Sequence, residues 1–258
     1  VERSRGLGDV YKRQLLGQGV LDFSDVKVVA IDEADQMADM GFLPQVTKLL
    51  DRMPERTQHL LFSATLDGDV QVLVDKYMRD PVTHSTGEAT ASVDTMNHLL
   101  GVVESREERN ELVVAIGKLR QRTVMFMRTK YAVDRQVKKL VRAGVPAVGI
   151  HGNKGQNSRQ SALDGFTEGK SSVLVATDIA ARGIDVKDVE LVVHIDPPAE
   201  HKAYVHRAGR TARAGASGTV VTLTFADAQH DTEKMMAKAG VHPTVLPGAK
   251  LIAALRKS

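Results

Sequence analysis

Short apolar runs rich in Val and Ile alternate along the chain with segments whose apolar residues recur at helical spacing. This alternation is typical of βαβ units, in which helices cover both faces of a parallel sheet. The first part of the chain predicts strands over 27–31 and 57–62 and helices over 44–53 and 68–79. Two strands are too few for an independent parallel sheet of ordinary size.

The segment over 87–94, GEATASVD, is small, polar and without periodicity, so we expect a linker there. After it the alternation restarts and is more complete. It predicts helices over 106–120, 130–143, 156–168 and 200–209, and strands over 123–127, 147–150, 172–176, 190–195 and 219–225. We therefore expect a complete α/β domain over 95–230, followed by a tail over 231–258 to which we assign no chemistry.

Composition limits the class of protein. A length of 258 residues suits one large domain or two small ones, and 42% hydrophobic with 26% charged residues excludes a wholly disordered chain. The absence of cysteine excludes disulfides, thiolate nucleophiles and cysteine-ligated metal sites. Neither a membrane span nor a secretory signal is visible. We expect a cytoplasmic monomer with no membrane partner.

The charge balance permits a polyanionic partner. Lys and Arg number 35 against 32 Asp and Glu, a formal net charge of +3. Aromatic residues make up only 4% and there is no Trp, which argues against a surface that binds single strands mainly by stacking bases.

Three carboxylates follow the first predicted strand, in the segment VVAIDEADQM: Asp32, Glu33 and Asp35. Open parallel sheets bind their ligands at the carboxyl ends of strands. Adjacent acids at such a place suit a hard cation such as Mg²⁺, with a second acid left to orient an attacking water. An acidic loop that caps a helix accounts for the same residues equally well.

Two further polar groups follow predicted strands or helices. Ser63 and Thr65 end the second strand at the same sheet edge, where their hydroxyls could bond the acids. Downstream, the segment YVHRAGRTARAG places Arg207, Arg210 and Arg213 three residues apart, on one face if helical. Guanidinium groups gathered in this way suit the recognition of phosphate. A solvated basic helix is the alternative interpretation.

Together these segments resemble the DEAD-box RNA helicases of superfamily 2. The resemblance implies an α/β fold of two RecA-like lobes that close on ATP at their interface and on RNA across their upper face, here a partial first lobe plus a complete second lobe. The matching motifs are Asp32–Glu33–Ala34–Asp35, Ser63–Ala64–Thr65, Phe126 to Thr129, Gln156 to Arg159, ATDIAARGID at 176–185 and HRAGRTAR at 206–213.

For ATP the resemblance implies roles on both lobes. Asp32 is similar to the ligand that holds Mg²⁺ through water, and Glu33 to the group that positions or deprotonates the hydrolytic water. Arg210 and Arg213 resemble the arginine fingers on the γ-phosphate. The remaining implied residues contact the nucleotide or couple hydrolysis to lobe closure: Gly183 and Asp185 for contact, and Asp35, Ser63, Thr65, His206 and Arg207 for coupling.

For RNA the resemblance implies contacts to phosphates and sugars, which agrees with the low content of aromatic residues. Such contacts predict little preference for the base sequence of the RNA. One departure is Ala212, which stands where many members have Gly, and we do not expect it to disturb the fingers. The implied RNA contacts are Arg128, Thr129, Gly152, Gln156, Arg159, Thr177 and Arg182.

The phosphate-binding P-loop, GxxxxGK[ST], does not occur in the sequence. The segment GFTEGKSS at 165–172 is one residue short and lies between a helix and a strand, so it reads as an ordinary connection. We expect 15–86 to be the C-terminal part of the ATP-binding lobe and 1–14 to be a leader foreign to the domain. The chain alone is then expected to turn over no ATP.

The leading hypothesis is therefore part of an ATP-dependent RNA helicase, which unwinds duplexes or remodels RNA–protein complexes. A nonenzymatic RNA-binding or scaffold module is one alternative. A DNA-directed superfamily 2 helicase is another, and the spelled-out DEAD box and HRAGRTAR segment disfavour it.

Overall fold

The computed structural model divides the chain into two compact units, Val1–Thr86 and Gly87–Ser258, which we call the first and second unit. The structure describes residues 22–66, 68–85, 96–119, 122–181, 186, 188–212 and 218–256. The predicted leader 1–14 and the predicted linker 87–94 lie outside these residues.

The first unit contains a parallel pair of strands, with Val28 opposite Gln58 and Ile31 opposite Leu61. Its helices and strands are β1 (Val28–Ile31), α2 (Ala34–Asp39), α3 (Leu43–Leu50), β2 (Gln58–Leu61) and α4 (Asp69–Tyr77). The two predicted strands and the two predicted helices are confirmed within a few residues, whereas the short α2 was not predicted.

The two strands of the first unit bury one face. Ile31 packs with Leu50 and Leu73 in a core made with the helices. Side chains alternate across a strand, and on the other face the exposed fractions are 53% for Val28 and 38% for Leu60. Among the described residues, the first unit therefore has an apolar core on one side of its strand pair.

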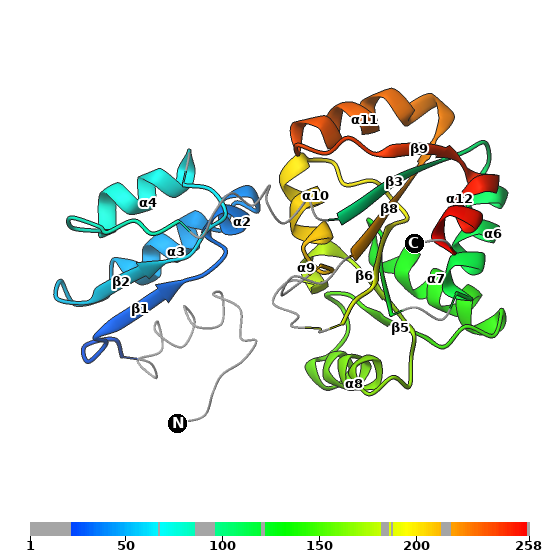
Figure 1. Ribbon diagram of the computed structural model, residues 1–258. Helices are drawn as coiled ribbons and strands as arrows, with labels where there is room; N and C mark the ends of the chain where they lie inside the picture. Colours follow the sequence, from blue (N-terminus) through cyan, green and yellow to red (C-terminus); the bar gives the residue numbers. More distant parts are fainter. Residues whose placement is uncertain are drawn as a thin grey trace. The chain divides into compact units, whose positions relative to one another are not determined.

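The second unit is larger, and Figure 1 shows its sheet with helices on both faces. Its elements are β3 (Met96–Val103), α6 (Arg106–Gly117), β4 (Thr123–Phe126), α7 (Lys130–Arg142), β5 (Ala147–Ile150), α8 (Gln156–Thr167), β6 (Val173–Ala176), α9 (Asp178–Ala181), β7 (Leu191–His194), α10 (His201–Ala208), β8 (Gly218–Phe225), a 3₁₀ turn (Ala226–Ala228), α11 (Gln229–Lys238), β9 (Thr244–Pro247) and α12 (Gly248–Leu255).

The seven strands of the second unit lie in the order β5-β6-β4-β7-β8-β3-β9, and all neighbours are parallel. Strands β4, β6 and β7 are buried along their whole length, as continuous apolar runs predict. One core packs α8, α10 and α11 against the sheet, and the other packs α6, α7 and α12. The predicted parallel α/β architecture is confirmed.

Two strands were missed. β3 was not predicted, because Asn97, His98 and Gly101 interrupt its apolar run. β9 is short, mostly exposed and ends in Pro, and it pairs with β3 at the sheet edge. The tail predicted over 231–258 therefore adds a strand to the sheet, and α12 buries Leu251 and Leu255 against it. The boundary predicted at 230 falls inside α11.

The segment 165–172 is the connection from α8 to β6, as predicted. Gly169 takes the left-handed conformation with φ of +76°, and the Ser171 N–H donates to the Gly165 carbonyl at 3.1 Å. No helix among the described residues has the length and apolarity to cross a membrane.

Candidate functional site

The residues 32–35 of the first unit, which we call the acidic turn, follow β1 directly. Asp32 is exposed and its Oδ1 accepts the Glu33 N–H at 2.9 Å, while Asp35 is buried in the first turn of α2. Glu33 has a left-handed backbone, φ 52° and ψ 46°, which is uncommon for a residue other than glycine. Such a conformation at the end of a strand is a mark of many functional sites.

The end of β2 is bonded to this acidic turn. The Phe62 N–H donates to the Ile31 carbonyl at 2.8 Å, and the Ala34 N–H donates to the Phe62 carbonyl at 3.2 Å. The Ser63 hydroxyl accepts the Asp35 N–H at 3.1 Å. The expectation that both strand ends share one edge is confirmed. Ser63 reaches the acidic segment through a backbone amide.

The acidic turn fits a cation held mainly through water. Among the described residues no group of three His, Asp or Glu side chains could enclose a metal ion. Asp32 nevertheless offers an exposed carboxylate, the ligand type that Mg²⁺ prefers, and Mg²⁺ commonly keeps several waters while bound to one or two carboxylates and to phosphates.

In the second unit, polar residues gather at the carboxyl ends of three adjacent strands. Arg128 and Thr129 follow β4, Gly152 follows β5 and Thr177 follows β6. Because the strands are parallel and neighbours in the order β5-β6-β4, these residues lie along one sheet edge. Arg128, Thr129 and Gly152 are exposed there. Gln156 and Arg159, in the first turn of α8, follow the β5 turn.

Local bonds hold these turns. Thr129 caps α7, because its hydroxyl accepts the Ala132 N–H at 3.2 Å. In the β5 turn, His151 is buried and its Nε2 lies 3.1 Å from both carboxylate oxygens of Asp134. Lys154 Nζ donates to the Gly149 carbonyl at 2.7 Å. The sequence carried no separate signal for the pair of His151 and Asp134, which are 17 residues apart.

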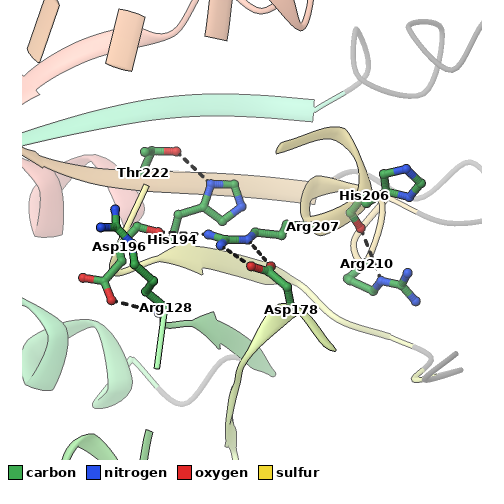
Figure 2. Close-up of polar contacts among 8 residues, drawn as sticks. All are labelled: Arg128, Asp178, His194, Asp196, His206, Arg207, Arg210 and Thr222. Atoms are coloured by element: carbon green, nitrogen blue, oxygen red, sulfur yellow. Dashed lines mark hydrogen bonds and ion pairs between the residues drawn. The ribbon is translucent and has the colours of Figure 1, made fainter. Parts of the chain in front are cut away.

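The segment over 206–212, which we call the arginine segment, does not form the continuous helical face that the spacing of its arginines suggests. α10 ends at Ala208 with Gly209 as its cap, so Arg207 lies in the helix and Arg210 beyond it. Arg210 Nε donates back to the His206 carbonyl at 3.3 Å (Figure 2). Arg207 and Arg210 therefore do not share a helical face.

Arg207 is buried, with only 5% of its side chain exposed, and its guanidinium is held within the second unit. Nε and Nη2 donate to the two carboxylate oxygens of Asp178 at 2.5 and 2.8 Å, and Nη1 donates to the Asp196 carbonyl at 2.9 Å. The guanidinium also lies 5.1 Å from the ring centre of Phe126. Asp178 and Asp196 were missed, although both stand shortly after strands.

A buried polar cluster supports α10 from the sheet. Tyr204 Oη lies 2.8 Å from His98 Nδ1, and His194 Nδ1 lies 3.1 Å from the Thr222 hydroxyl (Figure 2 draws the second contact). Burial, followed by the charge of Arg207, holds the pKa of His194 well below 6.5. Burial also raises the pKa of Tyr204. Both side chains are therefore neutral at pH 7.

Comparison with known proteins bears on both units. The family model of the DEAD/DEAH box helicase matches residues 7–73, and that of the helicase conserved C-terminal domain matches residues 108–215. The E. coli DEAD-box protein SrmB, solved bound to the regulator of ribonuclease activity A, is 32% identical. The match covers 59% of this chain and 89% of that one, with a TM-score of 0.54. The chain belongs to the DEAD-box helicase family.

Two further proteins extend the similarity. The ATP-dependent RNA helicase DBP2 of Candida albicans is 40% identical over 214 residues, which are 81% of this chain and 38% of that protein. S. cerevisiae Dbp5, solved bound to RNA and ADP BeF3, shares the fold at a TM-score of 0.87 and 24% identity, over 100% of this chain and 71% of that one. The chain spans 38% to 44% of the length of the DBP2 relatives it matches.

The DEAD-box membership predicted from the motifs is confirmed, as is the RecA-like fold. Four of the residues to which the motifs assign roles lie outside the part of the chain that the structure describes: Arg182, Gly183, Asp185 and Arg213.

Proposed function

We propose that this chain is the portion of an ATP-dependent RNA helicase that carries the DEAD and SAT motifs and the RNA-binding edge of the second unit. The parent protein would couple ATP hydrolysis to duplex unwinding or to the remodelling of RNA–protein complexes. The observation that carries the proposal is the line of polar residues at the carboxyl ends of β4, β5 and β6. A relative that is 40% identical supports it, because that protein is named an ATP-dependent RNA helicase. S. cerevisiae Dbp5, which shares the fold, was solved bound to RNA.

RNA binds along this edge through its backbone in the proposal. Exposed Arg128 offers a guanidinium to a phosphate, and backbone amides in the Gly152 turn offer neutral donors. Contacts of this kind read phosphates and 2′-hydroxyls, so binding depends little on base sequence. The full set of proposed RNA contacts is Arg128, Thr129, Gly152, Gln156, Arg159, Thr177 and Arg182.

ATP is proposed to use residues of both units. Glu33 orients or deprotonates the attacking water, while Arg210 and Arg213 stabilise the charge that develops on the phosphoryl oxygens. Gly183 and Asp185 contact the nucleotide. Asp32 holds Mg²⁺ through water, and the ion would neutralise charge on the phosphates.

Coupling between hydrolysis and RNA binding is assigned to the residues that connect these motifs. The Ser63 hydroxyl, which accepts the Asp35 amide, supports this for the first unit. The ion pair of Arg207 with Asp178 supports it for the second unit, because it joins α10 to α9. The proposed coupling residues are Asp35, Ser63, Thr65, His206 and Arg207.

Titration of a fluorescently labelled ten-nucleotide single-stranded RNA with the chain, at several salt concentrations, tests RNA binding. We expect the affinity for RNA to fall with rising salt, so that log K against log salt has a negative slope. In Arg128→Ala this slope should become shallower by about 0.7, because one phosphate contact disappears. Arg142→Ala, an exposed arginine at the opposite end of α7, is the matched control and leaves the slope unchanged. No binding even at low salt, or equal slopes in the two variants, contradicts the proposal. Equal affinity for DNA of the same sequence would favour a DNA-directed helicase.

ATP turnover by the chain is the second test. Without a GxxxxGK[ST] sequence the chain is expected to show no RNA-stimulated release of phosphate. Turnover that Glu33→Gln abolishes would show that the chain is a competent ATPase and would reject this expectation.

A further inference from the structure

The order of strands in the second unit contains a topological switch point between β4 and β7. These neighbours are parallel, with Phe126 opposite His194 at their carboxyl ends. The chain leaves β4 for α7, which packs in the core with α6 and α12, and leaves β7 toward α10, which packs in the opposite core. Open α/β sheets bind their ligands where neighbouring strands exit to opposite faces in this way.

Asp196, two residues after β7, bonds to the elements on both sides of the switch point. Its Oδ2 accepts the Arg128 backbone N–H at 3.0 Å, and its Oδ1 accepts Arg109 Nη1 of α6 at 3.2 Å. Its backbone carbonyl accepts Arg207 Nη1 of α10 at 2.9 Å. Figure 2 draws the contact of Asp196 with Arg128. One residue thus contacts the turn after β4 and helices from both faces.

Partial burial strengthens the contacts of Asp196 with Arg109 and Arg207, and the charge of its carboxylate strengthens those with Arg109 and the Arg128 amide. The side chains of Asp196 and Arg109 are 21% and 19% exposed, and Arg207 is almost fully buried. Hydrogen bonds to ionised groups are shorter and stronger than neutral ones, and a buried guanidinium that loses its acceptor is left with its full desolvation cost. Arg109 also lies 5.1 Å from the ring centre of Phe225, which limits its freedom to follow Asp196 elsewhere.

We propose that Asp196 is a positioning residue that fixes the turn of Arg128 and Thr129 relative to the end of α10. The inference rests on the proposed function, in which Arg128 and Thr129 bind RNA and Arg210 binds the nucleotide. Asp196 touches neither ligand. It sets the distance between two ligand-binding segments that leave the sheet on opposite faces, and a shift of either segment is transmitted through it to the other.

Amide hydrogen exchange of the 258-residue chain, followed residue by residue by NMR, tests the positioning directly. In Asp196→Asn we expect the Arg128 amide to exchange about tenfold faster, because the neutral side-chain amide keeps only one acceptor oxygen, which accepts more weakly than a carboxylate and cannot serve both Arg128 and Arg109. In Arg207→Lys, which removes the donor to the Asp196 carbonyl, the same Arg128 amide is expected to exchange faster, by a smaller factor. The amides of Val192 and Val193 in β7 report whether the fold is kept.

Asp188→Asn is the matched control. Asp188 is exposed, its contact with Arg122 is long at 3.9 Å, and Asn tolerates its left-handed backbone. It should leave the Arg128 amide unchanged. The proposal is overturned if the Arg128 amide exchanges as slowly in Asp196→Asn as in the unmodified chain. It is also overturned if Arg207→Lys speeds amide exchange only in α9 and α10.

RNA affinity distinguishes this inference from the proposed function. Asp196→Asn should weaken binding of the labelled RNA about threefold to tenfold, a modest loss because Arg128 itself remains. Asp188→Asn should not. An unchanged affinity in Asp196→Asn overturns the positioning role. If the unmodified chain binds no RNA, the proposed function fails, while the exchange of the Arg128 amide still decides whether Asp196 joins the two segments.

Discussion

The two units share the same pattern of apolar strands but differ in how many faces of those strands are covered by helices. In the second unit, β6 and β7 are continuous apolar runs that are buried on both faces. In the first unit, β1 is an equally apolar run, yet only one of its faces packs against helices among the described residues. The pattern thus identifies the strands in both units. It does not tell how many layers cover them, because coverage depends on helices elsewhere in the chain.

The candidate functional residues of the two units also lie on sheets that differ in coverage. In the part of the chain that the structure describes, the acidic turn of the first unit follows a strand pair with a core on one face. The proposed RNA-binding edge and the arginine segment lie on a sheet with a core on each face. Residues that must be held within fractions of an ångström benefit from a rigid scaffold. We infer that the second unit supplies a preformed platform.

The largest expected difference between the units comes from one leucine on a strand in each. Leu174→Ala in β6 removes a side chain that is 1% exposed and should destabilise the second unit by about 2–5 kcal/mol. Leu60→Ala in β2 removes one that is 38% exposed and should cost the first unit much less. Urea unfolding followed by hydrogen exchange in each unit measures both. Equal losses would contradict the difference in coverage.

A smaller effect is expected from packing around the arginine segment. A Cβ at Gly218 would overlap the Thr211 hydroxyl and lie 2.8 Å from the Ala212 N. Gly218→Ala should therefore cost about 1–3 kcal/mol of unfolding free energy. Gly165→Ala, in α8 with open space around it, is the control and should raise stability by about 0.5–1 kcal/mol. An unchanged free energy of unfolding in Gly218→Ala would show that Thr211 and Ala212 move to make room for the added methyl group.

A third, still smaller effect concerns pH. His194 has a lowered pKa in the folded chain, so below pH 6.5 the unfolded chain takes up a proton that the folded chain does not. Stability is therefore full above that pH and falls below it, by at most about 1.4 kcal/mol per pH unit for this group. His194→Asn should reduce the loss of unfolding free energy between pH 7.5 and pH 5.5. An identical pH dependence in the two proteins would show that His194 is not its source.

Much of the fold and the candidate site followed from the sequence. Strands β4 to β8 were predicted, because buried parallel strands are short apolar runs. Arg128, Gly152 and Thr177 were named through the resemblance of their motifs to the DEAD-box family, and the structure places them at strand ends. β3 and the edge strand β9 were missed, since the polar residues and Gly of β3 and the Pro of β9 break that pattern.

Side-chain partners could not be read from spacing. The carboxylate of Asp178 lies 29 residues from Arg207 in the sequence, and Asp196 lies 68 residues from Arg128. Such pairs form because the strand order brings β4, β6 and β7 together, which no local pattern specifies. The end of α10 agrees with the helix predicted over 200–209, whereas the bond from Arg210 back to the His206 carbonyl required the structure.

The central claim is that RNA binds along the edge formed by the ends of β4, β5 and β6 in the second unit. Hydrogen exchange of the chain with and without saturating single-stranded RNA tests it most directly. The account predicts slower exchange over 127–130, 151–159 and 177–179, with no change at the amino ends of the same strands. Protection at the amino ends, or on β9 and α12, would contradict it.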